Sequence, residues 1–227
     1  SVKFAKEIDI PTNRVYKDID TLVGEELKLP KEERIQVCSI LTPNFLHFPM
    51  ALKLLENGFH VICEKPLEVT TEKIDPMIEA SEKNNVTLAA ILNRRFNESV
   101  VVLKDAVDKG RFGTLSLVEA SIKWYRTQEY YDSAGWRGTW ALDGGGALMN
   151  QSIHTIDLLL HVMGDVDSVR AQTRLVAHEG IEVEDTATAM VTFENGALGT
   201  IQASTACWSA DGHPAEIQIS GEHGSVF

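Results

Sequence analysis

A glutamate–lysine pair followed by proline is the first group of residues in this sequence with the types and spacing for chemistry: "CEKP" at residues 63–66. Glu64 and Lys65 follow a short β-branched run. We expect them at the carboxyl end of a parallel strand, where open α/β sheets bind ligands. Such a pair suits charge stabilisation or proton transfer, although a surface ion pair is the alternative. The neighbouring predicted strands also end in polar side chains, which favours a ligand site at this edge.

A polar stripe marks the helix predicted after the glycines of "GGGALMNQSIHTIDLLLH", residues 144–161. At about 100° per residue, Asn150, His154 and Asp157 fall on one narrow face. His161 continues this stripe, and apolar side chains occupy the opposite face. The stripe suits a functional site, and the alternatives are a solvated face or a core histidine satisfied by its neighbours. No third strong ligand such as cysteine accompanies it, so we predict no metal site.

The three glycines themselves do not form a phosphate-binding loop. The dinucleotide fingerprint needs G-x-G-x-x-G directly after a buried strand, and "WRGTWALD" before these glycines is not an apolar strand. No other segment of the sequence matches that fingerprint or the G-x-x-x-x-G-K-[ST] loop. We expect the glycines instead to let the helix begin close beneath a bound ring.

Aromatic residues gather between residues 124 and 140, in "WYRTQEYYDSAGWRGTW". This segment holds three of the four Trp and three of the four Tyr, interleaved with arginines and acids. Flat aromatic faces beside planar donors suit a polyhydroxylated sugar. A buried loop or an oligomer contact is the alternative.

Composition narrows the class of protein. The 227 residues carry a formal charge of −12, which argues against nucleic-acid or anionic-membrane partners. No apolar run approaches the roughly 20 residues that span a bilayer, and residues 1–8 read as helix rather than as a signal peptide. Cys38, Cys63 and Cys207 are interpreted as buried, reduced thiols of a cytosolic protein.

The pattern of elements changes near residue 97. Before it, apolar runs alternate with amphipathic stretches, which predicts a parallel sheet covered by helices. The strands expected there are 35–41, 60–66 and 86–92, the first of them buried on both faces. After it come a helix over 98–110 and long alternating strands, with a hairpin at Asn195-Gly196. The later strands expected are 114–126, 167–178, 184–206 and 215–227.

These motifs together resemble the Gfo/Idh/MocA family of NAD(P)-dependent oxidoreductases. They are "TPNFLH", "CEKPL", "NRRFN", "WYR" through "GGGALMNQSIHTIDLL", "EVEDTATAMVTFENGALGTI" and "ISGEHGSV". Their order and separation make the resemblance specific over almost the whole chain. It implies an α/β fold: the C-terminal part of a Rossmann domain over residues 1–93, then an α+β domain with an open, mainly antiparallel sheet over 94–227. We expect the glycine-loop βαβ unit and some C-terminal strands to be missing.

The resemblance also implies roles for single residues. Lys65 would polarise the reacting oxygen, and His154 would exchange the hydroxyl proton while hydride moves to or from nicotinamide. The cofactor contacts implied are Thr42, Pro43, Asn44, His47, Glu64, Lys65, Asn93 and Arg94. With the aromatic segment included, the substrate contacts expected are Lys65, Arg126, Trp136, Arg137, Asn150, His154 and Asp157.

Two departures from the family pattern stand out. Many members carry aspartate four residues before the histidine, where this chain has Asn150. An amide cannot take a proton, so the relay is expected to rest on His154 and Lys65. The N-terminal glycine loop is absent from these 227 residues, and with it the residue that selects NAD or NADP.

We therefore expect a cytoplasmic oxidoreductase that moves hydride between NAD or NADP and a secondary alcohol of a sugar, nucleotide-linked sugar or inositol. It is expected to form a homodimer or homotetramer through the second-domain sheet and to bind neither metal, nucleic acid nor membrane. The alternatives are an NAD-using glycoside hydrolase and a non-catalytic relative that senses cofactor or sugar. The sequence leaves open which sugar, which hydroxyl and which direction.

Overall fold

The computed structural model describes residues 5, 7 and 9–227, so the helix expected over residues 1–8 lies almost wholly outside the described residues. The chain divides into two units. Unit 1 comprises Ser1–Thr42, Leu46–Glu64 and Thr71–Ala90. Unit 2 comprises Pro43–Phe45, Lys65–Thr70 and Ile91–Phe227. Two short segments that a boundary at residue 93 would give to the first domain therefore pack with unit 2.

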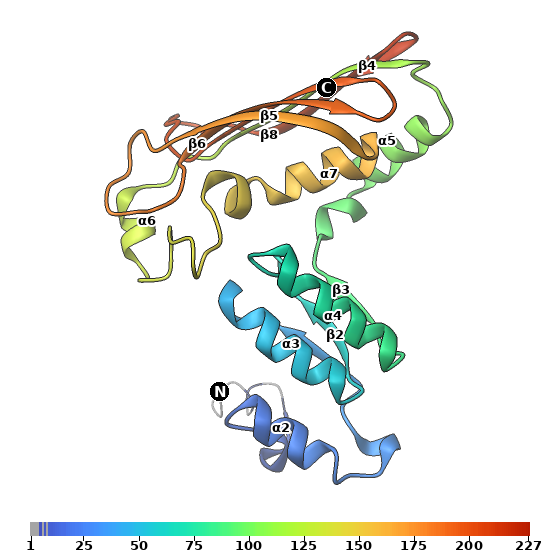
Figure 1. Ribbon diagram of the computed structural model, residues 1–227, viewed down its shortest axis with the longest axis vertical. Coiled ribbons are helices and arrows are strands. Elements are labelled where there is room, and N and C mark those ends of the chain that lie inside the picture. Colours follow the sequence, from blue (N-terminus) through green and yellow to red (C-terminus); the bar gives the residue numbers. More distant parts are fainter. Residues whose placement is uncertain (1–4, 6, 8) are drawn as a thin grey trace. The chain divides into compact units, whose positions relative to one another are not determined.

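Unit 1 is built on three parallel strands in the order β1-β2-β3, as the alternating pattern predicts. These are β1 (Val37–Ile40), β2 (His60–Cys63) and β3 (Leu88–Ala90). The crossover helices α3 (His47–Glu56) and α4 (Thr71–Lys83) lie side by side (Figure 1). Their apolar faces form the core of this unit, in which Leu54, Met77 and Val61 are fully buried.

The other face of the unit 1 sheet is not covered by the described residues. Val37 is 49% exposed and Ile62 38% exposed, so the prediction that the first strand is buried on both faces was wrong. Pattern alone cannot tell a strand covered on two faces from one covered on one, because β-branched residues suit both. The prediction of buried thiols is confirmed for Cys63, which is fully buried, and is wrong for Cys38 and Cys207, which are half-buried. Partial burial raises the pKa of the Cys38 thiol to about 11.

Unit 2 contains a six-stranded sheet in the order β5-β6-β7-β4-β8-β9. Its strands are β4 (Leu115–Lys123), β5 (Val166–Arg174), β6 (Thr186–Phe193), β7 (Leu198–Ser204), β8 (Ala215–Gly221) and β9 (Gly224–Val226). Only the β4–β7 pair is parallel among these strands, which confirms the mainly antiparallel sheet. Gly196 adopts φ +86°, and the predicted hairpin there joins β6 to β7.

One face of this sheet carries the core of unit 2. Helices α5 (Glu98–Asp108) and α7 (Ile153–Met163) pack against it (Figure 1). Leu159 and Met163 of α7 meet Phe193 and Ile122 of the sheet. The remaining short elements are η1 (Thr12–Arg14), α2 (Ile19–Glu26), η2 (Lys31–Glu33), η3 (Asn44–Leu46), η4 (Asn93–Phe96), α6 (Gln128–Asp132) and η5 (Ala147–Gln151).

The helix expected as one piece over residues 144–161 is interrupted. Its first part, η5, is a π-helical turn in which Ser152 N donates to Ala147 O, five residues earlier, at 3.0 Å. The regular helix α7 begins only at Ile153. Within α7, Leu158 and Val162 are buried, whereas Leu160 is 42% exposed.

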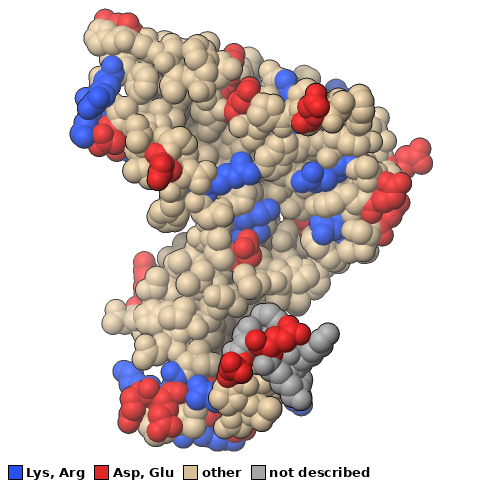
Figure 2. All heavy atoms as spheres, turned by 180° about the vertical axis from the view of Figure 1, so that it is seen from behind, with Lys and Arg blue, Asp and Glu red and all other residues tan. Residues whose placement is uncertain are grey.

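Charged side chains are mixed over the surface. Figure 2 shows lysines and arginines in small groups among acidic residues, without a continuous basic area on that face. Within the described part of the chain, no helix combines the length and apolarity needed to cross a membrane.

Candidate active site

Lys65 lies in the short segment Lys65–Thr70, which packs with unit 2. Its Nζ donates a hydrogen bond of 3.0 Å to the main-chain oxygen of Asn150. The peptide bond that follows Lys65 is cis, and the next residue, Pro66, is buried. The "CEKP" lysine and the glycine–histidine segment, 85 residues apart in sequence, therefore meet in one place.

The glycines before η5 bring the chain onto a carboxylate of the protein itself. Gly146 N donates to Glu184 Oε2 at 3.1 Å, and Leu148 N donates to Glu184 Oε1 at 2.9 Å. A Cβ on Gly146 would lie 1.8 Å from Glu184 O, so only glycine fits. These N–H groups already bind an anion of the chain, which explains physically why the segment is not a phosphate loop.

Asp143, which the sequence analysis did not single out, is a second buried carboxylate in this region and is 2% exposed. Its Oδ1 accepts from Asn150 Nδ2 at 2.6 Å and from Asn44 Nδ2 at 3.2 Å, and its Oδ2 accepts from Gly138 N at 2.9 Å. Burial raises the pKa of Asp143, against the opposing effects of the Gly138 N–H and the positive charges of Arg137 and Lys65. Asp143 thereby fixes both amides, and the carbonyl oxygen of the Asn150 amide points away from it.

His154 is the second residue of α7 and is half-buried. It follows Asn150, whose main-chain oxygen holds Lys65, by four residues in the chain. Asp157, one of the expected substrate contacts, accepts two hydrogen bonds from Arg95. Arg95 Nε donates to Asp157 Oδ2 at 2.8 Å, and its Nη2 donates to Oδ1.

The predicted "NRRF" motif forms η4, which begins at Asn93, and uses its two arginines differently. Arg95 forms the ion pair with Asp157, which raises the pKa of Arg95 chiefly through the hydrogen bond. The Arg94 guanidinium lies over the Trp124 ring, 4.9 Å from its centre. Arg94, a cofactor contact implied by the family resemblance, thus stacks on an aromatic ring, and Arg95, which carried no such expectation, binds Asp157.

The remaining predicted cofactor residues divide between the units. In unit 1, Thr42 follows β1, and its main-chain oxygen lies 2.8 Å from Nε2 of the fully buried His47. Glu64 follows β2, and its N–H donates to Ile40 O. Pro43 and Asn44 belong to unit 2, where Asn44 binds Asp143.

The aromatic segment forms a connected group in unit 2, which we call the arginine–tyrosine cluster: Arg126, Tyr130, Arg137 and Gln151. Arg126 Nη2 donates to Gln151 Oε1 at 2.8 Å. Gln151 Nε2 and Arg137 Nη1 both donate to Tyr130 Oη, at 3.1 and 2.8 Å. The Arg137 guanidinium also stacks on the Trp136 ring, at 4.6 Å from its centre. The structure thus brings together the three predicted substrate residues of this segment.

A buried histidine–aspartate pair contacts the main chain of Arg126. His178 Nδ1 lies 3.0 Å from Asp185 Oδ2, and its Nε2 lies 2.8 Å from Arg126 O. Both ring nitrogens of His178 thus lie within hydrogen-bond distance of an oxygen, one on the Asp185 side chain and one on the Arg126 main chain. Burial raises the pKa of Asp185, but the N–H groups of Ala177 and Val176 and the His178 side chain outweigh it and hold this pKa below its usual value.

Replacing Asp185 with asparagine is expected to lower the free energy of unfolding by about 3 kcal/mol at neutral pH, because it breaks a buried pair. Since the folded-state pKa is depressed, this stabilisation is present above the unfolded-state pKa and disappears as pH falls through the folded-state value. Urea unfolding of both proteins between about pH 3 and pH 7 measures it. A stability difference that stays constant over that range would contradict the assignment.

Comparison with known proteins identifies the family. Residues 100–227 match the GFO/IDH/MocA C-terminal domain, and residues 1–91 match the oxidoreductase family with an NAD-binding Rossmann fold. The chain belongs to the GFO/IDH/MocA family. The family resemblance and the fold class drawn from the sequence motifs are thereby confirmed.

Three relatives of this GFO/IDH/MocA chain illustrate its similarities. Myo-inositol 2-dehydrogenase of Thermotoga maritima is 28% identical over 94% of this chain and 60% of its own length. The WlbA dehydrogenase structure from Chromobacterium violaceum is 38% identical, with TM-score 0.81, over 89% of this chain and 57% of its own. The WlbA dehydrogenase structure from Bordetella pertussis is 34% identical, with TM-score 0.83, over 92% of this chain and 62% of its own. Both WlbA structures hold NADH and UDP-GlcNAcA. The chain spans less than two thirds of each relative.

Side chains that the sequence analysis missed share one property: they act on residues far away in sequence. Asp143 and Glu184 are the clearest, since Asn44 lies 99 residues from Asp143, and Gly146 lies 38 from Glu184. The available signal was an acidic residue directly before the glycines, in "LDGGG". Across residues 5, 7 and 9–227, no three His, Cys, Asp or Glu side chains are grouped to hold a metal ion.

Proposed function

We propose that this chain forms part of an NAD(P)-dependent dehydrogenase that interconverts a secondary alcohol and a ketone on a sugar, nucleotide-linked sugar or inositol. The observation that carries the proposal is the position of Lys65, whose ammonium donates to Asn150 O, four residues before His154 in the chain. The higher identity to the two WlbA dehydrogenases than to the inositol dehydrogenase supports a nucleotide-linked sugar as the substrate class.

The residues of unit 1 fit part of a dinucleotide. Strands β1 and β2 run parallel and end beside Thr42 and Glu64, and the carboxyl edge of such a sheet is where nucleotides bind. Thr42 and Glu64 would contact the ribose and nicotinamide side. A bound nicotinamide supplies the acceptor or donor of hydride.

The chain's own side chains supply the proton chemistry. In the oxidative direction, Lys65 donates a hydrogen bond to the reacting oxygen and stabilises the negative charge that develops on it. His154 accepts the hydroxyl proton as the carbon loses hydride, and it returns that proton in the reductive direction. Asn150 cannot accept a proton, but its amide carbonyl, oriented by Asp143, can accept a hydrogen bond from a substrate hydroxyl.

The test is an assay of the protein expressed from its complete gene, with NAD or NADP and a panel of sugars, nucleotide-linked sugars and inositols. The expected result is substrate-dependent formation of reduced cofactor. Release of a sugar without net reduction would indicate a glycoside hydrolase instead. Tight cofactor binding without turnover on any substrate would indicate a sensing role.

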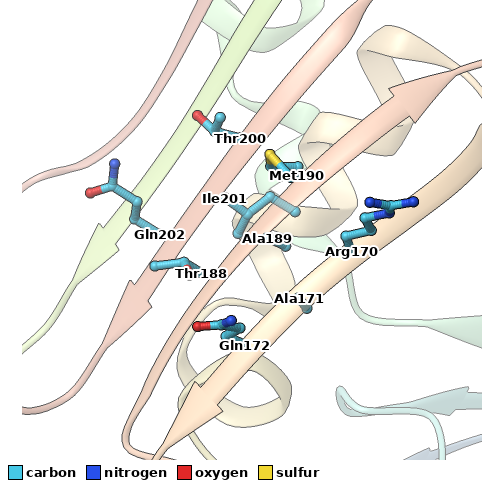
Figure 3. Close-up of a pocket in the computed structure, with 9 residues that line it drawn as sticks. All are labelled: Arg170, Ala171, Gln172, Thr188, Ala189, Met190, Thr200, Ile201 and Gln202. Carbon is cyan, nitrogen blue, oxygen red and sulfur yellow. The ribbon is translucent and has the colours of Figure 1, made fainter.

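We also propose that the outer face of the unit 2 sheet binds a second copy of the chain. Figure 3 shows this face over β5, β6 and β7, where Arg170, Met190 and Thr200 form one cross-strand row. Met190 is 61% exposed there, and exposed apolar side chains on a sheet face favour association. Met190→Asp is expected to shift the protein to monomers in light scattering, whereas exposed Asp211→Ala should not. A monomeric wild-type protein would refute this.

A further inference from the structure

The arginine–tyrosine cluster has a pattern of hydrogen bonds that satisfies all of its acceptors internally. The Gln151 carbonyl oxygen is taken by Arg126, and the two acceptor positions of the Tyr130 hydroxyl are taken by Arg137 and Gln151. The Tyr130 hydroxyl can still donate its own proton in a hydrogen bond. The cluster can therefore act on a ligand only as a donor.

The two arginines retain donors in excess. Among the described residues, Arg126 makes one further bond, from Nη1 to Tyr125 O, and Arg137 makes no hydrogen bond besides that to Tyr130. Each guanidinium carries five N–H groups, so most of them remain available. The Nε atoms of both are buried without a partner among the described residues. Both side chains are half-buried, so their outer nitrogens remain within reach of a ligand.

The cluster also lacks a countercharge. Within the described residues, no carboxylate lies within salt-bridge distance of Arg126 or Arg137. The charge of Arg137 acts to lower the pKa of Asp143. Both oxygens of that carboxylate, however, already accept hydrogen bonds from Asn44, Asn150 and Gly138. Both guanidinium groups lie over the Tyr130 ring, 5.2 and 4.4 Å from its centre, and two partly desolvated cations so close to one ring favour the binding of an anion.

We propose that Arg126, Tyr130 and Arg137 bind an anionic group of the substrate, a carboxylate or a phosphate. The inference rests on the proposed function, because Gln151 directly follows Asn150, whose main chain holds Lys65. Planar guanidinium groups and a hydroxyl donor match the oxygens of either anion. Neutral sugars and inositols are then poor substrates.

The test is calorimetric binding of two probes, UDP-GlcNAcA and UDP-GlcNAc, to the protein expressed from its complete gene, with NADH present so that no turnover occurs. The second probe lacks the carboxylate and keeps the diphosphate. Arg137→Gln is expected to weaken binding about ten- to hundredfold for any probe whose anion it holds. Loss confined to UDP-GlcNAcA assigns the carboxylate to the cluster, and an equal loss for both probes assigns the diphosphate.

Unchanged affinity of both probes in Arg137→Gln, or no binding of either probe to the wild type, overturns the proposal. Exposed Arg111→Gln is the matched control and should bind both probes as the wild type does. If Arg137→Gln does not fold, Arg126→Lys and Tyr130→Phe replace it, since they remove the planar fork and the hydroxyl donor separately. Binding needs no oxidation, so a loss seen here without any turnover would leave this inference standing while the proposed function fails.

Discussion

Replacing Lys65 with methionine is expected to lower kcat of the proposed oxidation by about 10²–10⁴-fold. The side chain keeps its length but loses the ammonium that binds Asn150 O and stabilises charge on the reacting oxygen. His154→Asn is expected to lower kcat by a similar factor, because asparagine cannot accept the hydroxyl proton. Steady-state kinetics, with thermal unfolding as the check on folding, measures both effects.

The helix itself provides the matched control for that experiment. His161 lies on α7 seven residues after His154 and is also half-buried. His161→Asn should leave kcat and KM near their wild-type values. Undiminished turnover in both Lys65→Met and His154→Asn would contradict the proposed roles, and loss in all three variants would point to structural damage instead.

Asp143→Ala is expected to destabilise the fold strongly. It leaves the Gly138 N–H and the Asn150 amide without their acceptor in a buried place. Buried donors without partners lower the free energy of unfolding by about 3 kcal/mol in total. The Asn150 amide is then no longer held, so KM for substrate should rise as well. Urea unfolding and steady-state kinetics check the two effects.

Asparagine at position 143 should not restore the wild-type stability. Oδ1 and Oδ2 of Asp143 both accept hydrogen bonds, and an amide has only one oxygen to offer. Asp143→Asn is therefore expected to lie between Asp143→Ala and the wild type, and exposed Asp167→Ala should match the wild type. An Asp143→Asn protein with full stability would show that one of these contacts contributes little.

Elements with a strong local signal could be predicted from sequence. The parallel strands of unit 1, the hairpin after Phe193 and the mainly antiparallel sheet followed from apolar periodicity and turn residues. The interruption between η5 and α7 could not be predicted in this way. A π-turn leaves the composition of a helix unchanged, and the hydrogen bonds of Ala147 and Leu148 to Glu184 at its start join segments far apart in sequence.

The residues of the candidate site likewise differ in how strongly the sequence marks them. Lys65 and Arg126 stand out by residue type next to a motif, and the structure places both in hydrogen-bonded networks of unit 2. The partners that hold them, Gln151 and His178, carry no signal of their own, because their role comes from contacts between segments far apart in the chain. The catalytic and binding roles themselves stay predictions.

The bond from Lys65 to the main chain of Asn150 has a consequence for how this site can vary. A carbonyl of the backbone is present whatever residue occupies position 150, so substitution there changes the side chain offered to a ligand without removing the anchor of the ammonium. Substitution at position 150 therefore removes the hydrogen bond from the Asn150 amide to Asp143 but leaves the main-chain acceptor of Lys65 in place. The group that anchors the ammonium and the side chain that faces Asp143 thus belong to one residue but can be changed separately.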